Sequence, residues 1–138
     1  MAGYSGTPLP QKLGIKTGVT VVTINAPPNY RRLLGKIPDD VTFSNRLKPG
    51  SNFVHLFTCR RGELEEKMSI LRDKISDDGT VWVSWPKKSS GISTDVTESV
   101  IREIALPLGF VDIKVCAVDE TWSGLKLMIR RENRNSGK

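Results

Sequence analysis

The chain has 138 residues and a formal net charge of +6, with 38% hydrophobic and 26% charged residues, a composition typical of a globular domain. This length can bury one core without disulfides or metal ions but leaves no room for two full domains. No stretch approaches the roughly 18 consecutive apolar residues of a membrane span, and the N-terminus shows no apolar signal core, so we expect a cytoplasmic location and no membrane partner. Two separated cysteines and a single histidine argue against a disulfide scaffold and against a metal site with several histidines.

The first half of the chain begins with a segment rich in glycine, proline and small polar residues. We expect an irregular N-terminal arm over residues 1–16. The β-branched run Val19–Ile24 predicts a buried strand, which must stop before Pro27 because proline cannot donate to a ladder. A short helix is predicted from about Asn29, and a brief strand over Val41–Ser44.

The middle of the chain carries the strongest periodic signals. Phe53–Phe57 predicts a second strong strand, and Gly62–Ser76 predicts the clearest helix. The apolar stripe of that helix recurs at steps of 4, 3 and 4 residues, at Leu64, Met68, Leu71 and Ile75. A turn at Asp77–Gly79 then leads into a strand over Thr80–Trp85.

The last third predicts one more helix and two strands. Asp95 and Glu98 have the spacing of a capping box at the start of the helix. Strands are predicted over Val111–Val118 and Leu125–Ile129, and the six residues between them are expected to form a hairpin connection. The charged end of the chain, 132–138, is expected to be a flexible tail.

Strands alternate with helices until the final pair of strands. This order predicts an α/β fold: a small Rossmann-like three-layer domain over residues 17–131, with a mostly parallel sheet and a terminal antiparallel strand.

In such a sheet, ligands bind beside the loops that follow the carboxyl ends of the strands. Basic residues, two tryptophans and a few acids gather in those loops. We therefore predict a ligand-binding site formed by Asn25, Tyr30, Arg60, Arg61, Trp85, Lys87, Lys88, Ser89, Asp119, Glu120 and Trp122. The set suits a ligand with a phosphate or carboxylate and a planar group. Trp122, expected inside a polar hairpin turn, is the strongest single candidate.

Each of these signals has a simpler structural interpretation. The arginine pairs, taken alone, are typical of solvated surface charge, and Trp85 could belong to the core. His55 alternates within an apolar strand, which favours a buried, hydrogen-bonded histidine over a catalytic base. Cys59 follows the same strand beside Arg60 and Arg61, which would lower its thiol pKa, although an inert cysteine is the more frequent outcome. Cys116 is expected in the core.

The usual cofactor signals of Rossmann-like folds are missing. A dinucleotide or S-adenosylmethionine site normally has a glycine-rich turn after the first strand and an acidic residue at the end of the second. Here the first turn is Asn25–Asn29, which contains two prolines, and the second strand is followed by Asn45 and Arg46. Because prolines remove the amide donors that cradle a pyrophosphate, we expect no cofactor and no metal.

Three sequence stretches resemble a family of small bacterial proteins known only as a domain of unknown function. They are GYSGTPL (3–9), WVSWPKK (82–88) and CAVDETWSGLK (116–126), and the resemblance covers nearly the whole chain. It implies a bacterial protein without an established activity. The order of elements from Leu71 to Arg130 is also similar, in topology, to the second half of Rossmann-type methyltransferases, which implies a truncated methyltransferase-like scaffold.

These observations leave three functional hypotheses. The first is a non-catalytic or regulatory module that binds an anionic small molecule or protein partner at the sheet edge, because the basic and aromatic residues lack a nucleophile–base pair. The second is an enzyme, either a divergent methyltransferase or a transferase acting on a phosphorylated compound, with Asp119 or Glu120 as base. The third is nucleic-acid binding, which the interspersed acidic residues disfavour. A homodimer is a further alternative if the terminal strand or a helix face is exposed.

Overall fold

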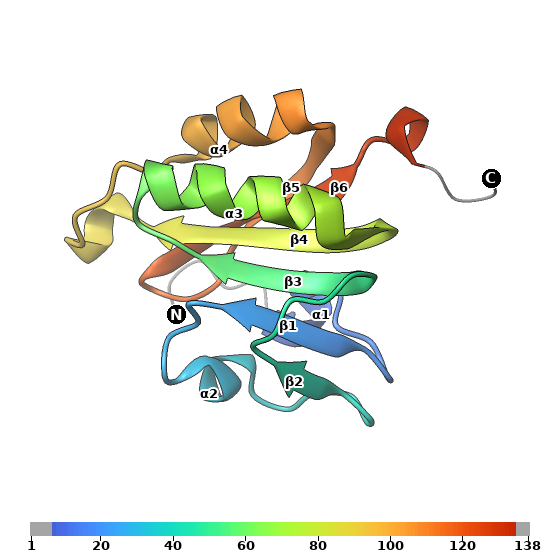
Figure 1. Ribbon diagram of the computed structural model, residues 1–138. Helices are drawn as coiled ribbons and strands as arrows, with labels where there is room; N and C mark the ends of the chain where they lie inside the picture. Colours follow the sequence, from blue (N-terminus) through green and yellow to red (C-terminus); the bar gives the residue numbers. More distant parts are fainter. Residues whose placement is uncertain (1–6, 135–138) are drawn as a thin grey trace.

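The computed structural model describes residues 7–134, which form one sheet with helices on both faces (Figure 1). Within that range the strands are β1 (Thr20–Ile24), β2 (Thr42–Ser44), β3 (Ser51–Phe57), β4 (Ile75–Pro86), β5 (Phe110–Ala117) and β6 (Trp122–Ile129). The helices are α1 (Leu9–Leu13), α2 (Tyr30–Leu34), α3 (Arg61–Lys74) and α4 (Glu98–Ala105), with short 3-10 turns η1 (Lys88–Ser90), η2 (Leu106–Leu108) and η3 (Arg131–Asn133). None of the described helices is long and apolar enough to cross a membrane.

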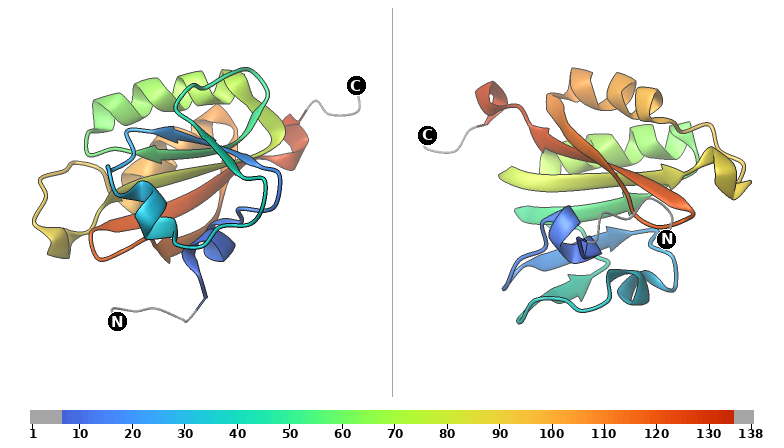
Figure 2. Two further views of the ribbon diagram at one scale, coloured as in Figure 1. Left: turned by 90° about the horizontal axis from the view of Figure 1, so that it is seen from below. Right: turned by 180° about the vertical axis from the view of Figure 1, so that it is seen from behind.

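The strands form a single sheet in the order β2-β1-β3-β4-β6-β5. The first four in this order pair in parallel, and β6 lies antiparallel between β4 and β5. Parallel neighbours require crossover connections, and these place α3 and α4 on one face of the sheet, opposite α1 and α2 (Figure 2). The predicted Rossmann-like α/β fold, with a mostly parallel sheet and a terminal antiparallel strand, is therefore confirmed.

The larger core lies between the sheet and the pair α3 and α4. Leu64, Met68 and Leu71 of the predicted stripe are fully buried, as are Ile101 and Ala105 of α4. Burying side chains of this size stabilises the fold by roughly 1.5–3 kcal/mol each, with alanine contributing less. This packing fixes the N-terminus of α3 beside the carboxyl end of β3.

The opposite face carries a smaller core under α1 and α2. Leu13 of α1 and Leu34 of α2 are buried there against Trp82 of β4 and Phe57 of β3. The indole Nε1 of Trp82 donates a hydrogen bond of 2.8 Å to the carbonyl oxygen of Leu13. A buried indole N–H requires such a partner, so α1 is both packed and hydrogen-bonded to the sheet.

The structure differs from the expected irregular arm at residues 9–15. Pro10 lies in the first turn of α1, where proline is tolerated, and Gly14, with φ of 85°, ends the helix in the left-handed region. Leu13 and Ile15 are buried. The apolar side chains that were expected only to attach the arm therefore order it as a helix; residues 3–6 of the first resemblance stretch lie outside the described residues.

The start of the expected flexible tail is also ordered. Asn133 Nδ2 donates to the carbonyl oxygen of Gly109 at 3.3 Å, and Arg134 Nε donates to that of Ile129 at 2.9 Å. The first bond joins η3 to the turn before β5, and the second joins the residue after η3 to the end of β6. Residues 135–138 lie outside the described part of the chain.

Two local predictions were wrong. The turn expected at Asp77–Gly79 lies inside β4, where the pairing with β3 shifts register after Ser51 and Ile75. An ideal Cβ on Gly79 would lie 2.6 Å from Ile75 Cγ1, so only glycine allows this close approach. The N-cap of α4 is Thr97, whose hydroxyl accepts from the Val100 amide at 3.2 Å, and not Asp95.

Candidate functional site

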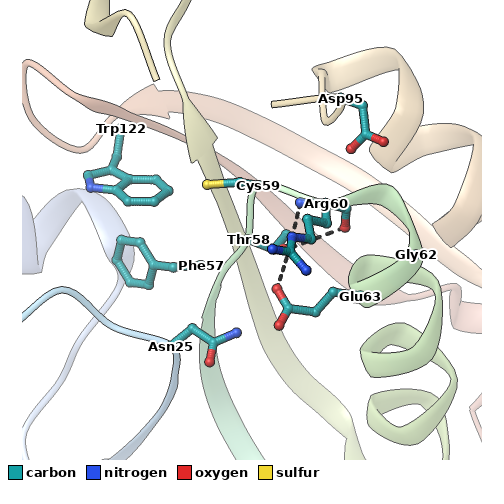
Figure 3. A pocket seen from close by; sticks show the side chains of 9 residues that line it. All are labelled: Asn25, Phe57, Thr58, Cys59, Arg60, Gly62, Glu63, Asp95 and Trp122. Carbon is teal, nitrogen blue, oxygen red and sulfur yellow. Dashed lines mark hydrogen bonds between the residues drawn. The ribbon is translucent and has the colours of Figure 1, made fainter. Parts of the chain in front are cut away.

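A cavity of about 820 Å³ opens at the carboxyl edge of the parallel strands (Figure 3). We call it the carboxyl-edge cavity. It is lined by Asn25 after β1, Phe57 to Arg60 at the end of β3, Gly62 and Glu63 in the first turn of α3, Asp95 before α4, and Trp122 at the start of β6. These segments are distant in sequence and meet because the parallel strands end at one edge of the sheet.

Two aromatic rings form one wall of this cavity. Phe57 and Trp122 meet edge to face, with ring centroids 5.0 Å apart and an interplanar angle of 89°. Phe57 is buried and Trp122 is half-buried, so the indole keeps part of its surface open to the cavity. Trp122 is the first residue of β6. The prediction that it lies inside the hairpin turn is therefore wrong.

The opposite wall is polar and includes the start of α3. The Thr58 hydroxyl donates to Glu63 Oε1 at 2.7 Å and also lies 3.3 Å from the amide nitrogen of Arg60. Glu63 lies in the first helical turn, where a carboxylate interacts favourably with the helix dipole. The exposed Arg60 supplies a cation at the same mouth. The cavity therefore presents one guanidinium, two carboxylates and an aromatic wall.

Asp95 caps α3 rather than its own helix. Its Oδ1 accepts a hydrogen bond of 2.7 Å from the amide of Arg61, and the Thr94 hydroxyl donates to the carbonyl oxygen of Cys59 at 2.8 Å. The segment before α4 is thereby attached to the loop between β3 and α3, which closes one side of the cavity.

We expect Asp95→Ala to lower the free energy of unfolding by about 1 kcal/mol, the usual cost of losing a side-chain cap. Chemical denaturation would measure this change. Asp73→Ala is a matched control, because Asp73 is exposed on α3, the helix that Asp95 caps. Equal stability of the two variants would contradict a capping role for Asp95.

The thiol of Cys59 is not activated by its arginine neighbours. Burial raises its pKa, Glu63 raises it further, and Arg60 lowers it by less. The predicted lowering of this pKa is therefore wrong, because burial and then the Glu63 carboxylate outweigh the effect of Arg60. Cys116 is half-buried on the edge strand β5 and is not fully in the core.

Of the predicted site residues, Asn25, Arg60 and Trp122 line the same cavity. Asn25 adopts a left-handed backbone with φ of 60°, which asparagine tolerates better than most residues. Arg61 instead extends across α3 and α4, where its Nη1 lies 3.1 Å from Glu103 Oε2 and its Nε 3.6 Å from Glu65 Oε2.

Tyr30 and Asp119 do not line the cavity and have structural contacts behind its aromatic wall. The buried Tyr30 hydroxyl lies 2.9 Å from His55 Nδ1, and burial raises the pKa of the phenol. Asp119 Oδ1 accepts from the amides of Thr121 and Trp122, at 2.8 and 2.7 Å. Asp119 thus orders the hairpin that presents Trp122.

The remaining predicted residues lie beside the cavity or on the surface around it. Trp85 is half-buried against the larger core, and the Lys87 amide donates to the Thr121 carbonyl oxygen at 2.8 Å, joining the two loops. Lys88 and Ser89 lie in η1, and they and Glu120 are exposed.

His55 is fully buried and has a partner on each ring nitrogen. Nδ1 lies 2.9 Å from the Tyr30 hydroxyl and Nε2 lies 2.7 Å from the Ser84 hydroxyl, while the ring stacks on Phe57 at 4.3 Å. Burial lowers the pKa of His55 to about 3, so the imidazole is neutral at physiological pH. The prediction of a satisfied buried histidine is confirmed.

Sequence reasoning missed six of the lining residues as site candidates: Phe57, Thr58, Cys59, Gly62, Glu63 and Asp95. A threonine five residues before a glutamate at a strand-to-helix junction was an available signal for the Thr58–Glu63 bond. Nothing local indicated Asp95, because its role depends on how α4 packs beside α3. In the described part of the chain, no group of three or more histidine, cysteine or acidic residues could hold a metal ion.

Comparison with known proteins finds solved structures of similar fold. No family model and no curated protein sequence matches the chain. Among solved structures, a protein from Sulfolobus solfataricus assigned to the type 11 methyltransferases aligns with a TM-score of 0.62 at 16% identity, covering 94% of both chains. The chain has a methyltransferase-like fold.

Two further structures support this result. The fibrillarin of Aeropyrum pernix, solved with natively bound S-adenosyl-L-methionine, has a TM-score of 0.53 at 11% identity, covering 91% of this chain and 70% of its own. A TehB-like S-adenosylmethionine-dependent methyltransferase from Corynebacterium glutamicum has a TM-score of 0.52 at 8% identity, covering 94% and 91%. At these identities the likeness extends to the fold alone.

The residues at the usual nucleotide position do not fit S-adenosylmethionine. In the turn after β1, Pro27 and Pro28 have no amide hydrogen, and the Tyr30 amide is already bonded to the Pro27 carbonyl oxygen at 3.0 Å. At the end of β2, Ser44 Oγ accepts from the Arg46 amide at 3.1 Å, and no carboxylate follows. The two prolines and the bonded Tyr30 amide therefore reduce the donors that the turn can offer to the cofactor, and β2 lacks the acid that normally binds the ribose.

Proposed function

We propose that this methyltransferase-like domain is a non-catalytic binding module that holds a small carboxylate- or phosphate-bearing ligand in the carboxyl-edge cavity. The observation that carries the proposal is the combination of Arg60 with the open indole of Trp122 around a cavity of about 820 Å³. A guanidinium binds a carboxylate or phosphate through its planar fork, and the indole and Phe57 supply an apolar wall for a planar group.

The carboxylates of Glu63 and Asp95 narrow the chemical class of the ligand further. The carboxylate of Glu63 keeps acceptor capacity beyond its bond from Thr58, and that of Asp95 beyond its bond from the Arg61 amide. A ligand that carries a hydrogen-bond donor or an ammonium group beside its anion would use both. This arrangement favours a small zwitterion with a ring over a simple anion.

A thermal-shift assay with L-tryptophan, indole-3-acetate and nicotinate tests this proposal. We expect the melting temperature to rise with at least one of these aromatic carboxylates, by about 2 °C or more near saturation. L-Tryptophan should exceed indole-3-acetate if Glu63 and Asp95 contact an ammonium. Native mass spectrometry of the purified protein provides a search for ligands of other chemistry.

Matched variants test whether the rise in melting temperature comes from binding in the carboxyl-edge cavity. Arg60→Ala and Trp122→Ala should abolish the rise, whereas Lys88→Ala, on an exposed residue outside the cavity lining, should keep it. If no aromatic carboxylate stabilises the protein and no ligand is found by mass, or if Arg60→Ala and Trp122→Ala respond like the wild type, the proposal is wrong.

A divergent methyltransferase is the second candidate, and the fold relatives favour it. In that case S-adenosylmethionine would have to bind without the usual turn donors and without an acid after β2. A rise in melting temperature with S-adenosylmethionine would favour the enzyme, and its absence would favour the binding module.

A further inference from the structure

We propose a second ligand site at the opposite edge of the sheet, where Lys16, Lys114 and Lys126 bind a phosphate group. The site is a cavity of about 500 Å³ beside the loop after α1 and the amino ends of β1 and β3. We call it the amino-edge cavity. It is distinct from the carboxyl-edge cavity and does not depend on the function proposed for that cavity.

The first observation is a pair of like charges in register. Lys114 of β5 and Lys126 of β6 are directly opposite each other in the antiparallel ladder. Like charges at such positions destabilise a sheet. Within residues 7–134, neither lysine forms an ion pair with a carboxylate that would compensate this repulsion.

The second observation is that Lys126 and Lys16 line the same cavity. Lys126 is half-buried, and its pKa is lowered by burial and then by the charges of Lys114 and Lys16. The ammonium groups of Lys16 and Lys114 thus both act on that of Lys126, which lines the cavity together with Lys16, while Lys114 lies beside Lys126 on the neighbouring strand. Such a concentration of positive charge is offset most effectively by a multiply charged anion.

The other polar groups of the cavity suit a phosphate. Thr17, Asn52 and Thr80 line it and can donate hydrogen bonds from hydroxyl or amide groups. One carboxylate, Asp78, lies in the lining as well, where it accepts from the Ser76 hydroxyl at 3.1 Å. Lysines bind phosphate as point charges, so the set points to a phosphorylated small molecule or a nucleic-acid backbone.

Titration of the ¹⁵N-labelled protein with sodium tripolyphosphate tests the site. We expect saturable amide shifts at Lys16, Thr17 and Lys126, and about tenfold weaker binding in Lys126→Gln, the size of effect that follows from losing one charged contact. Lys36→Gln is the matched control, because Lys36 is an exposed lysine outside this cavity; its binding should be unchanged.

Two further measurements make the test decisive. Lys114→Gln should raise the melting temperature of the free protein, because it removes the repulsion from Lys126; a lower value would contradict the uncompensated charge. A single-stranded oligonucleotide that shifts the same amides more strongly than tripolyphosphate would assign the phosphate to nucleic acid, and the reverse order to a small molecule. Absence of saturation with both, or equal weakening by Lys36→Gln, would overturn the proposal.

Discussion

Leu13→Ala is expected to lower the free energy of unfolding by about 3 kcal/mol, the middle of the range for a fully buried leucine in a core. Leu13 is 0% exposed, and its carbonyl oxygen accepts the bond from the Trp82 indole. Truncating the side chain leaves a hole between α1 and the sheet, which a helix this short cannot close by shifting. Urea denaturation monitored by tryptophan fluorescence would measure the change.

Leu9→Ala is the matched control for this prediction. Leu9 lies in the same helix but is only partly buried. Leu9→Ala should therefore lower the free energy of unfolding by markedly less than Leu13→Ala. A loss below about 1 kcal/mol for Leu13→Ala would mean that α1 is a loosely attached arm, as the composition of the first 16 residues suggests.

Acidification is expected to destabilise the fold through its one histidine. The folded protein keeps His55 neutral, with a pKa of about 3, whereas the unfolded chain takes up a proton near pH 6.5. The contribution of neutral His55 to the free energy of unfolding is therefore present above pH 6.5, the pKa of histidine in the unfolded chain. It is lost as the pH falls from 6.5 toward 3. Linkage gives a loss of about 2 kcal/mol in the free energy of unfolding between about pH 7.5 and pH 5.

His55→Gln separates this effect from other titrations. The variant will be less stable at neutral pH, since it disturbs the bonds to Tyr30 and Ser84, but its stability should change far less between about pH 7.5 and pH 5. Asp112, whose pKa is lowered first by the hydrogen bond from Arg102, loses its contribution only below about pH 4. The same pH slope in wild type and His55→Gln would show that the histidine is not the titrating group.

The elements that local periodicity determines could be predicted from the sequence. The apolar stripe of α3 could be identified because Leu64, Met68 and Leu71 repeat at helical spacing, and all three are buried. The alternation of strands with helices was enough to predict the sheet and the edge at which the carboxyl-edge cavity lies. Helix α1 could not be predicted in this way, because it is ordered by Trp82, far away in the sequence.

The candidate site was predictable only as a location. Chain order brings Asn25, Arg60 and Trp122 to one edge, but it does not say where a side chain points. Arg61 turns away because Glu103 of α4 attracts it, and Asp95 joins the lining because it caps a helix on which it does not lie. Both outcomes depend on the packing of α3 beside α4, which carries no local sequence signal.

We propose that this chain keeps the methyltransferase-like fold without the cofactor site at the end of β1. Titration of the ¹⁵N-labelled protein with S-adenosylmethionine, followed through the amides of Asn25, Asn29 and Ser44 to Arg46, tests this proposal. We expect no saturable shift at these positions up to about 1 mM, which corresponds to binding weaker than about −4 kcal/mol. Saturable shifts there at micromolar concentrations would contradict it.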